Sequence, residues 1–424
     1  MQGRVEGMSN ALPSDVTDLL HRLDAFIADE IIPLEEQDDN RRFFDHRREW
    51  ARTDFENDGL PRPEWEELLS EVRKRADAAG FYRYSLPKEL GGGDGSDTAM
   101  AAVREHLAHR GLGLHNDLQN EHSIVGNVVF AHLVHLFGTK AQREELVEGL
   151  ITGSKGLTFG LTEPEHGSDA TWLETTAHRV GDDWVIDGAK RWNTGIHTAT
   201  HALIFARTAG EPGSANGITA FLVPTDAPGF EVPFYWWTLN MPTDHGEVLL
   251  RAVRVPAAAL FGTEGEALSI AQTFLHENRI RQAACSVGAA QYCIDRAVAH
   301  AKERHTFGRP LATRQAIQWP LVELHTEAEM CRTLIRRTAA DLDECRAEGR
   351  PAVSVGHMVS MCNYRSNRLV CEAADRAMQV LGGIGYSRHE PFEHIYRHHR
   401  RYRITEGAEE VQMRRVAGHL FGFL

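Results

Sequence analysis

The amino-acid sequence changes its pattern twice along the chain, and this alternation limits the possible folds more than any other feature. In the first third, apolar residues recur every three or four positions in stretches such as 65–76, which is typical of amphipathic helices. From Lys155 the sequence consists of short runs rich in β-branched and aromatic residues, separated by Gly, Pro and Asp, which indicates strands. After about Gly265 the helical pattern returns. We therefore expect a mainly α fold with a central β domain, divided at 1–155, 156–265 and 266–424.

The middle segment favours antiparallel strands over a parallel sheet. "RVGDDWV" (179–185) has the two-residue turn of a tight hairpin. Strands do not alternate with helices, as a parallel sheet would need, so we expect an antiparallel β-barrel or sandwich. The C-terminal segment has four stretches with helical spacing, which indicates a four-helix bundle. In the N-terminal helical domain, Ser14 is expected to cap the first helix and Pro33 to end it.

Composition and charge disfavour several classes of protein. The 60 Asp and Glu residues outnumber the 46 Lys and Arg residues, and the net charge of −14 disfavours nucleic acid as a partner. The N-terminal sequence has no apolar signal region, and no stretch reaches the roughly 18 apolar residues of a membrane span, so we expect a cytoplasmic protein. The six cysteines include no C-x-x-C pair, which favours small core residues over disulfides or a zinc site.

A basic run near the C-terminus, "HIYRHHRRYR" (394–403), is followed by three glutamates. His394 and His398 have the spacing of a metal-binding pair on a helix, but no nearby cysteine or carboxylate completes the set, so we favour a cationic surface and expect no metal site. One of the glutamates could be catalytic, or they could begin a helix, where negative side chains complement the dipole. The three are Glu406, Glu409 and Glu410.

Seven stretches, read in order, resemble the acyl-CoA dehydrogenase family of flavoproteins. They are "LPKELGG" (86–92), "LTEPEHGSD" (161–169), "KRWNTG" (190–195), "LFGTEGEAL" (260–268), "RHTFGRPL" (304–311), "QVLGGIGY" (379–386) and "ITEGAEEVQ" (404–412). This family has the same order of helical, β and helical domains. The resemblance implies FAD as the cofactor, an acyl-CoA as the substrate and an electron-transferring flavoprotein as the oxidant. It also implies a homo-oligomer, usually a tetramer built as a dimer of dimers.

The resemblance singles out Glu406 among the three glutamates. It occupies the position of the family's catalytic base, which removes the α-proton of the thioester while the β-hydride leaves to N5 of the flavin. A bound acyl chain would exclude water and raise the pKa of this carboxylate towards working pH. Glu409 and Glu410 would then lie in the first turn of the last helix. The positions that match the family's substrate-binding residues are Ser168, Arg279 and Gly407.

Some members of the family carry the base on an earlier helix, just before the arginine that corresponds to Arg279. The present chain has Asn278 there, and an amide cannot accept the proton. Glu277 is adjacent in sequence but lies about 100° around the helix from Asn278. Glu406 therefore remains our candidate for the base.

The other matched positions are predicted to bind FAD. In the family, the loop at 161–169 wraps the flavin, an indole packs against it, and a further set reaches the FAD of a neighbouring subunit. Two glycines allow close approach of the backbone. The predicted residues are Thr162, Ser168, Trp192, Thr194, Arg304, Thr306, Phe307, Gln315, Gln379, Gly382, Gly383, Ala408 and Glu410. Judged without the family, Trp192 is more typical of a core anchor in a strand.

The chain departs from the family pattern beside the predicted cofactor. Glu165 and His166 stand where small residues are usual, Ala408 and Glu410 replace threonine and glutamine, and Asn193 replaces an apolar residue. Our leading hypothesis is FAD-dependent dehydrogenation of an acyl-CoA to the trans-2-enoyl thioester. Two alternatives stay open. One is a flavin oxidase or hydroxylase that uses O2 on a small or carrier-bound substrate, and the other is a non-enzymatic helical scaffold that binds partners through its basic run.

Overall fold

The computed structural model of the protein describes residues 12–116, 124–126 and 128–423. The chain divides into two compact units. The helical unit comprises Met1–Arg48, Arg75–Gly126 and Asn278–Leu424, and the sheet unit comprises Glu49–Lys74 and Asn127–Glu277. Two helices, α3 (Pro63–Ala78) and α7 (Leu268–Glu303), contribute residues to both units. Residues 1–11, on which the expectation of no signal region rests, lie outside the described part.

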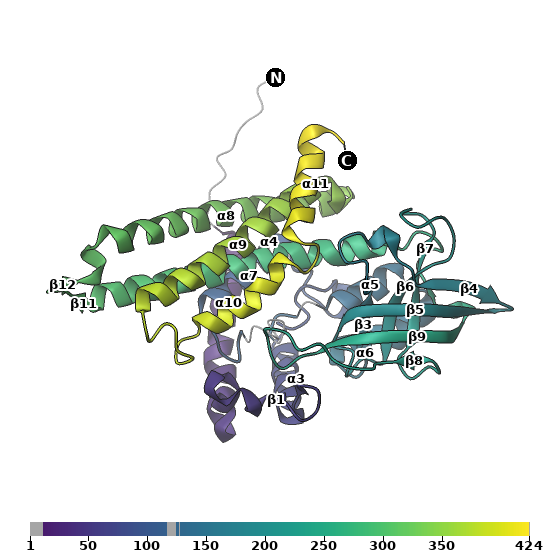
Figure 1. Ribbon diagram of the computed structural model, residues 1–424, viewed down its shortest axis with the longest axis horizontal. Coiled ribbons are helices and arrows are strands. Elements are labelled where there is room, and N and C mark those ends of the chain that lie inside the picture. The colour runs from purple at the N-terminus through teal and green to yellow at the C-terminus, as the bar shows by residue number, and fades with distance from the viewer. Residues whose placement is uncertain (1–11, 117–123, 127, 424) are drawn as a thin grey trace. The chain divides into compact units, whose positions relative to one another are not determined.

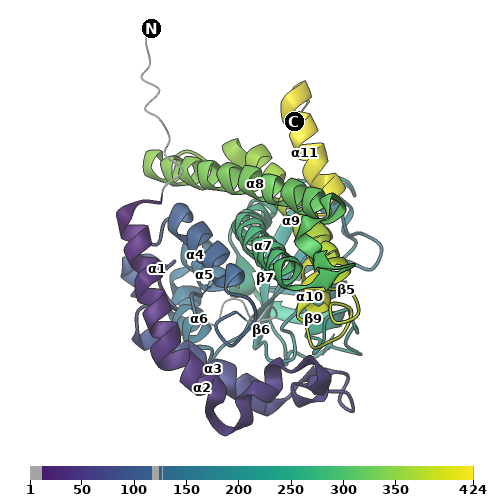
Figure 2. The same ribbon diagram turned by 90° about the vertical axis from the view of Figure 1, so that its left-hand side faces the viewer.

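The helical unit is organised around α9 (Gly356–Leu381). This helix packs against α8 (Gln315–Glu348), α10 (Phe392–Arg400) and α11 (Glu409–Phe421), and the second part of α7 shares the same apolar core (Figures 1 and 2). This unit also contains α1 (Ser14–Phe26), the π-helix Ile27–Ile31, α2 (Ile32–Glu36) and α4 (Asp97–His109). Short 3-10 helices of the chain are Gln37–Phe44, His46–Ala51, Lys88–Leu90, Ala170–Trp172, Ala257–Ala259, Leu311–Thr313, Ala352–Val355 and Arg401–Arg403.

The spacing of apolar residues explains why these segments are helical. The buried stripe of α8 recurs every three or four residues and faces the core of the helical unit. The stripe begins with Leu321, Leu324, Ala328, Cys331 and Ile335. All six cysteines of the chain are buried and free, so the prediction that they are small core residues is confirmed.

Two details of the N-terminal helices differ from prediction. Ser14 is the first residue of α1 rather than its cap, and no side-chain cap is made there. Pro33 does not end the helical run, because it lies in the first turn of α2, where a proline needs no N–H partner. The run continues to Glu36.

The sheet unit contains one eight-stranded sheet, preceded in sequence by α5 (Val129–Phe137) and α6 (Lys140–Thr152). The strand order is β10-β7-β6-β4-β5-β9-β8, and β3 pairs with β6 outside this path. Its strands are β3 (Leu157–Gly160), β4 (Thr176–Val180), β5 (Asp183–Thr194), β6 (His201–Arg207), β7 (Ile218–Pro224), β8 (Phe230–Glu231), β9 (His245–Pro256) and β10 (Leu260–Phe261). Two-residue pairs lie elsewhere, β1 (Thr53–Asp54) with β2 (Leu60–Pro61) and β11 (His305–Thr306) with β12 (Arg309–Pro310).

The sheet is mixed rather than purely antiparallel, which corrects one detail of the prediction. The hairpin at 179–185 is confirmed, since β4 and β5 are antiparallel and join through a two-residue turn at Gly181 and Asp182. Both β3 and β4, however, pair with β6 in parallel. Parallel neighbours need a long crossover, and the segment that contains the β4–β5 hairpin supplies the one between β3 and β6.

The predicted fold class is confirmed: helical segments precede and follow a central β-sheet. The helix α10 was not foreseen, because it overlaps the basic run, which was expected only as a cationic surface. Within the described residues, no helix combines the length and the apolar character that crossing a bilayer requires.

Candidate active site

Glu406 lies in a strained turn that precedes α11. Its φ of 58° is left-handed, as is the φ of 91° at Gly407, and a non-glycine residue in this region is uncommon. Arg279 on α7 donates from Nε and Nη2 to the carbonyl oxygen of Glu406, at 2.8 and 2.7 Å. Gln412 on α11 donates from Nε2 to the carbonyls of Glu406 and Gly407, both at 3.0 Å. The turn is therefore held by two side chains, and both act on its backbone.

The carboxylate of Glu406 is poised to accept a proton. Burial raises the pKa of Glu406 to about 7, against the opposing effect of Arg281, Arg279 and Arg401. Among the described residues, this carboxylate makes no hydrogen bond or ion pair within 4.0 Å. A carboxylate with a pKa near neutrality and no fixed partner suits a general base.

Glu409, three residues later, has the opposite environment. It accepts two hydrogen bonds from Arg368, at 3.0 and 3.1 Å, and two from Arg403, at 2.9 and 3.0 Å. These bonds from Arg403 and Arg368 lower the pKa of Glu409 to about 2. A permanently ionised, doubly paired carboxylate anchors the start of α11. Glu410 is exposed in the same first turn.

The prediction of a cationic surface at His394 and His398 was wrong. The side chains of His394, His398 and His399 are 1 %, 0 % and 0 % exposed. Burial, followed by the charge of Arg401, lowers the pKa of His398 well below its ordinary value, so this imidazole is neutral. His394 and His398 are four residues apart on α10 and, together with the adjacent His399, they face the core, where neutral histidines can be accommodated.

His398 and His399 belong to a buried polar network that fixes the residues before Glu406. Ser286 on α7 donates to Asn367 on α9 at 2.7 Å and lies 3.1 Å from Nδ1 of His399. Asn367 donates to the carbonyl of Tyr402 at 3.0 Å, and Nε2 of His398 lies 3.0 Å from the hydroxyl of Tyr402. In the described part of the chain, no cluster of three or more His, Cys, Asp or Glu side chains could hold a metal ion.

A second group of predicted residues lies in the sheet unit, where β5 holds the loop at 161–169. The backbone N–H of Arg191 donates to the carbonyl of Thr162 at 2.9 Å, and its Nη1 donates to the carbonyl of Pro164 at 3.4 Å. Lys190 donates from Nζ to the carbonyl of Leu161 at 3.3 Å. The sheet unit therefore brings Thr162 close to the β5 segment that carries Trp192 and Thr194.

Trp192 is not the core anchor that the residue alone suggested. Its side chain is 44 % exposed, its φ is 65°, and it lies at a break in the β5–β9 register. The indole packs against Trp236, with ring centroids 5.1 Å apart, and meets His245 edge-on at 6.4 Å. A bulge of this kind re-aims a side chain, and here it presents an aromatic face outwards. Ser168 and Thr194 are also exposed.

Most of the remaining predicted residues lie at exposed positions of the helical unit. The β11–β12 hairpin carries Phe307, which is 96 % exposed with a φ of 51°. A side chain at Gly382 or Gly383 would meet nothing within 4 Å. Ala408 immediately precedes α11. The exposed ones are Arg304, Phe307, Gln315, Gln379, Gly382 and Gly383, whereas Thr306 is partly buried. In the described part of the chain, none of these side chains takes part in the hydrogen bonds that hold Glu406.

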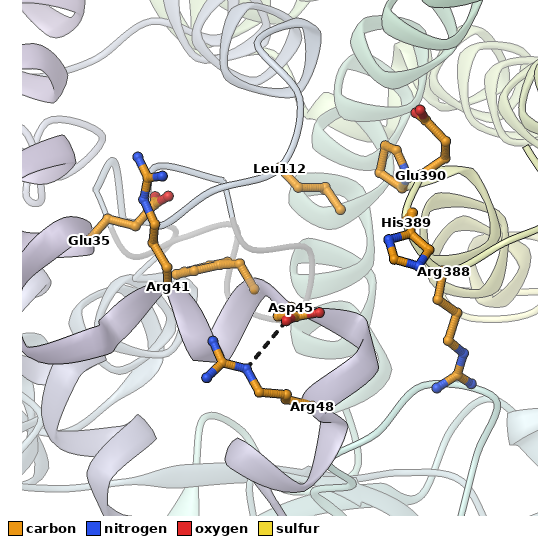
Figure 3. Close-up of a pocket in the computed structure, with 10 residues that line it drawn as sticks. Glu35, Arg41, Asp45, Arg48, Leu112, Arg388, His389 and Glu390 are labelled. Carbon is orange, nitrogen blue, oxygen red and sulfur yellow. Dashed lines mark ion pairs between the residues drawn. The ribbon is translucent and has the colours of Figure 1, made fainter. Parts of the chain in front are cut away.

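A cavity of about 580 Å³ lies within the helical unit (Figure 3). Its charged side chains already have partners: Arg48 pairs with Asp45 at 3.3 Å, Glu35 accepts from the N–H of Leu114 at 2.7 Å, and Glu390 pairs with an arginine at 2.6 Å. None of the predicted site residues lines it. The lining residues are Glu35, Arg41, Phe44, Asp45, Arg48, Leu112, Arg388, His389, Glu390 and Pro391.

Three residues that position the site were not predicted. Gln412, Glu163 and Lys190 lie in the motifs, but the sequence assigned no function to them. A signal existed for Lys190, because it continues the inward-facing register of Trp184 and Ile186 on β5 and a buried lysine requires an anionic partner. The earlier candidate position holds Asn278, which is buried, and the side chain of Glu277 lies outside the described part.

Comparison with known proteins agrees with these features. Three family models match the chain: Acyl-CoA dehydrogenase N-terminal domain over residues 37–154, middle domain over 158–253 and C-terminal domain over 265–421. A short-chain specific acyl-CoA dehydrogenase of Bos taurus is 32 % identical, with 82 % of this chain and 81 % of the relative covered. The subunit CarC of a caffeyl-CoA reductase–Etf complex of Acetobacterium woodii is 29 % identical, with 84 % and 90 % covered.

Solved structures agree as well. A structure of a putative acyl-CoA dehydrogenase from Mycobacterium abscessus superimposes with a TM-score of 0.83 at 26 % identity, over 97 % of this chain and 99 % of the other. The resemblance found in the sequence is thereby confirmed. The chain belongs to the acyl-CoA dehydrogenase family, whose members are FAD-dependent oxidoreductases.

Proposed function

We propose that this protein oxidises an acyl-CoA thioester between its α and β carbons, with Glu406 as the base that removes the α-proton. The observation that carries the proposal is the turn at Glu406, where a left-handed backbone is held by Arg279 and Gln412 and burial raises the carboxylate pKa to about 7. Such a base is partly ionised at neutral pH and accepts a proton readily.

The side chains of the sheet unit suit FAD, the cofactor of the family. Hydroxyl groups at Ser168 and Thr194 are exposed donors, and the exposed face of Trp192 offers an aromatic wall. In the helical unit, the exposed guanidinium of Arg304 suits a pyrophosphate. When bound, FAD supplies the acceptor for the β-hydride.

Each residue of the Glu406 turn has a distinct proposed task. Glu406 takes the proton on its carboxylate, while Arg279 and Gln412 hold the backbone so that the carboxylate keeps one direction. Arg279 is 4 % exposed and uses two donors on this turn, which supports a positioning task beside its predicted contact with substrate. Burial lowers the pKa of Arg279 to about 10, so it stays cationic at neutral pH.

The proposed electron acceptor is an electron-transferring flavoprotein, and a relative that forms part of an Etf complex supports it. A homotetramer is proposed because several residues predicted to reach a neighbouring FAD, Phe307 above all, are exposed. Six free thiols support a cytoplasmic location. For domains we propose 1–155, 156–265 and 266–424, in keeping with family matches that change over at 154–158 and 253–265.

Anaerobic titration with acyl-CoAs of increasing length and branching tests this function. We expect bleaching of the oxidised flavin by at least one thioester, and the Glu406→Gln variant should bind it without bleaching. Glu372→Gln, an exposed carboxylate on α9, is the matched control and should behave like the parental protein. An oxidised flavin that no thioester bleaches, or a high yield of peroxide in aerated turnover, would contradict the proposal and favour the oxidase alternative.

A further inference from the structure

Lys190 and Glu163 form an ion pair inside the sheet unit that the proposed chemistry does not use. The side chains are 0 % and 4 % exposed, and Nζ of Lys190 lies 2.7 Å from Oε1 of Glu163. Glu163 also accepts from the backbone N–H groups of Glu174 and Thr175, at 2.5 and 2.9 Å. The pair therefore fastens the start of the loop at 161–169 to the interior of β5 and to the segment before β4.

Stability alone does not account for this pair. Removing two charges from water costs several kcal/mol each, and apolar replacements of similar shape are often as stable. An ion pair differs from apolar packing because it fixes the orientation of both side chains. Both carboxylate oxygens of Glu163 accept hydrogen bonds, and Nζ of Lys190 donates to Glu163 and to the carbonyl of Leu161. Although burial lowers the pKa of Lys190 to about 8, Glu163 opposes this shift, and the lysine stays cationic at neutral pH.

The loop that the pair fastens is the one predicted to wrap the flavin. The other hydrogen bonds from β5 to this loop, two from Arg191 and one from Nζ of Lys190, end on backbone carbonyl oxygens. Among the described residues, the Lys190–Glu163 pair is therefore the only hydrogen bond between β5 and a side chain of the loop. Thr162 is the immediate neighbour of Glu163, and Ser168 lies five residues on. A substitution at Lys190 would therefore displace the hydroxyl groups of Thr162 and Ser168, although the side chain of Lys190 is itself buried.

We propose that Lys190 is a positioning residue for the cofactor: through Glu163 it sets the path of the loop at 161–169, so that Thr162 and Ser168 are held ready to donate to FAD. The inference rests on the proposed function, because it needs FAD as the cofactor. It goes beyond that function in assigning the affinity for FAD to a buried pair that does not contact it.

The test uses FAD affinity of the apoprotein in a double-mutant cycle. The variants are Lys190→Met, Glu163→Gln and the two combined. Lys190→Met leaves the buried carboxylate of Glu163 without its cation, and Glu163→Gln leaves the buried ammonium of Lys190 without its anion. Each single variant is therefore expected to unfold at a lower temperature. The combined variant has no unpaired charge and keeps a carbonyl oxygen for one backbone N–H. We expect it to fold with thermal stability near that of the parental apoprotein.

The readouts are the dissociation constant for FAD, from quenching of flavin fluorescence, and the visible circular dichroism of bound flavin. In the combined variant we expect the constant to rise roughly ten-fold or more and the dichroism to change, since a misplaced donor loses its hydrogen bond. The control is Arg254→Met with Asp183→Asn, which removes the exposed pair, 2.6 Å apart, between β9 and the start of β5. It should leave both readouts unchanged.

The outcomes separate this inference from the proposed function. If the combined variant binds FAD as tightly as the parental protein, with the same dichroism, the positioning role is overturned while the proposed function stands. An equal rise in the control variant would also overturn it, because the effect would then belong to the sheet in general. If the parental protein itself binds no FAD, the proposed function is overturned, and the positioning role of Lys190 is overturned with it.

Discussion

At the scale of single residues, the environment decides which of several carboxylates can act as a base. Glu406 and Glu409 are three positions apart, yet the pKa is raised to about 7 at Glu406 and lowered to about 2 at Glu409. The difference comes from burial at Glu406 and from hydrogen bonds to two arginines at Glu409. Composition and spacing do not distinguish the two residues, and only the family resemblance selected Glu406.

The raised pKa predicts a pH profile. Glu406 accepts a proton only when ionised, so kcat/KM should rise with pH and level off above an apparent pKa near 7. Steady-state rates with a dye acceptor across this range measure it, with a poor substrate to keep the chemical step limiting. A flat profile down to about pH 5, close to the ordinary range of a glutamic acid, would contradict the assignment.

Gly407 gives a second test at this scale. A Cβ at Gly407 would lie 3.1 Å from Nη2 of Arg279, so Gly407→Ala should displace the donor that holds Glu406, in addition to strain of about 1 kcal/mol or more from the φ of 91°. Rapid-mixing reduction of the flavin should slow by roughly ten- to a hundred-fold.

The matched control for this variant is Gly422→Ala. Gly422 has a similar φ of 73°, but a Cβ there meets nothing within 4 Å. It should cost similar strain without slowing reduction. Equal rates for both variants would show that Gly407 has no special part in positioning the base.

At the scale of elements, α10 has a sequence that indicates a charged surface, yet it forms a helix with one face buried. Its residues read as a cationic run, but His394, His398 and His399 face the core, and Arg397 pairs with Glu393 at 2.6 Å. Charge at neutral pH is the property that misled the prediction, because an imidazole loses its proton when buried. The helical spacing can be read from the sequence. The packing of α10 against α9, and the contact of His399 with Ser286 on α7, cannot.

The burial of His398 predicts a loss of stability in mild acid. Its folded-state pKa lies well below the ordinary value of about 6.5, so below that pH the unfolded chain binds a proton that the folded chain does not. The free energy of unfolding should therefore fall as pH decreases from about 6.5, by up to roughly 1.4 kcal/mol per pH unit for this group.

His398→Gln should flatten this dependence, because glutamine can still bond the hydroxyl of Tyr402 but does not titrate. Denaturant unfolding at a series of pH values measures the slope. The control is His21→Gln, an exposed residue of α1. If the His398 variant keeps the parental slope, the ring does not stay neutral in the folded protein.

At the scale of the whole molecule, the order of helical, β and helical segments could be predicted from residue patterns, since periodicity is local information. Pairing between distant strands could not, and the parallel partners β3 and β6 are separated by the whole β4–β5 hairpin. The candidate site shows the same difference between local motifs, which could be predicted, and long-range contacts, which could not. Motifs located Glu406 and Trp192, but the contacts of Arg279 with Glu406 and of Lys190 with Glu163 join residues that are far apart in the chain.

The assembly predicted for the whole molecule can be tested at Phe307. This side chain is 96 % exposed on the β11–β12 hairpin and is predicted to reach a neighbouring subunit's FAD. Phe307→Asp should therefore lower both the mass measured by light scattering and the FAD content per chain. Val180→Asp, at the exposed end of β4, should change neither. A monomeric parental protein that retains FAD would contradict the shared site.

The proposed function depends above all on removal of the α-proton by Glu406. The most direct measurement is rapid anaerobic mixing of the Glu406→Gln variant, loaded with FAD, with the acyl-CoA that bleaches the parental protein fastest. We predict that ligand binding persists while the rate of bleaching falls by roughly a thousand-fold, the scale of a lost general base. Bleaching of the variant at the parental rate would contradict the claim.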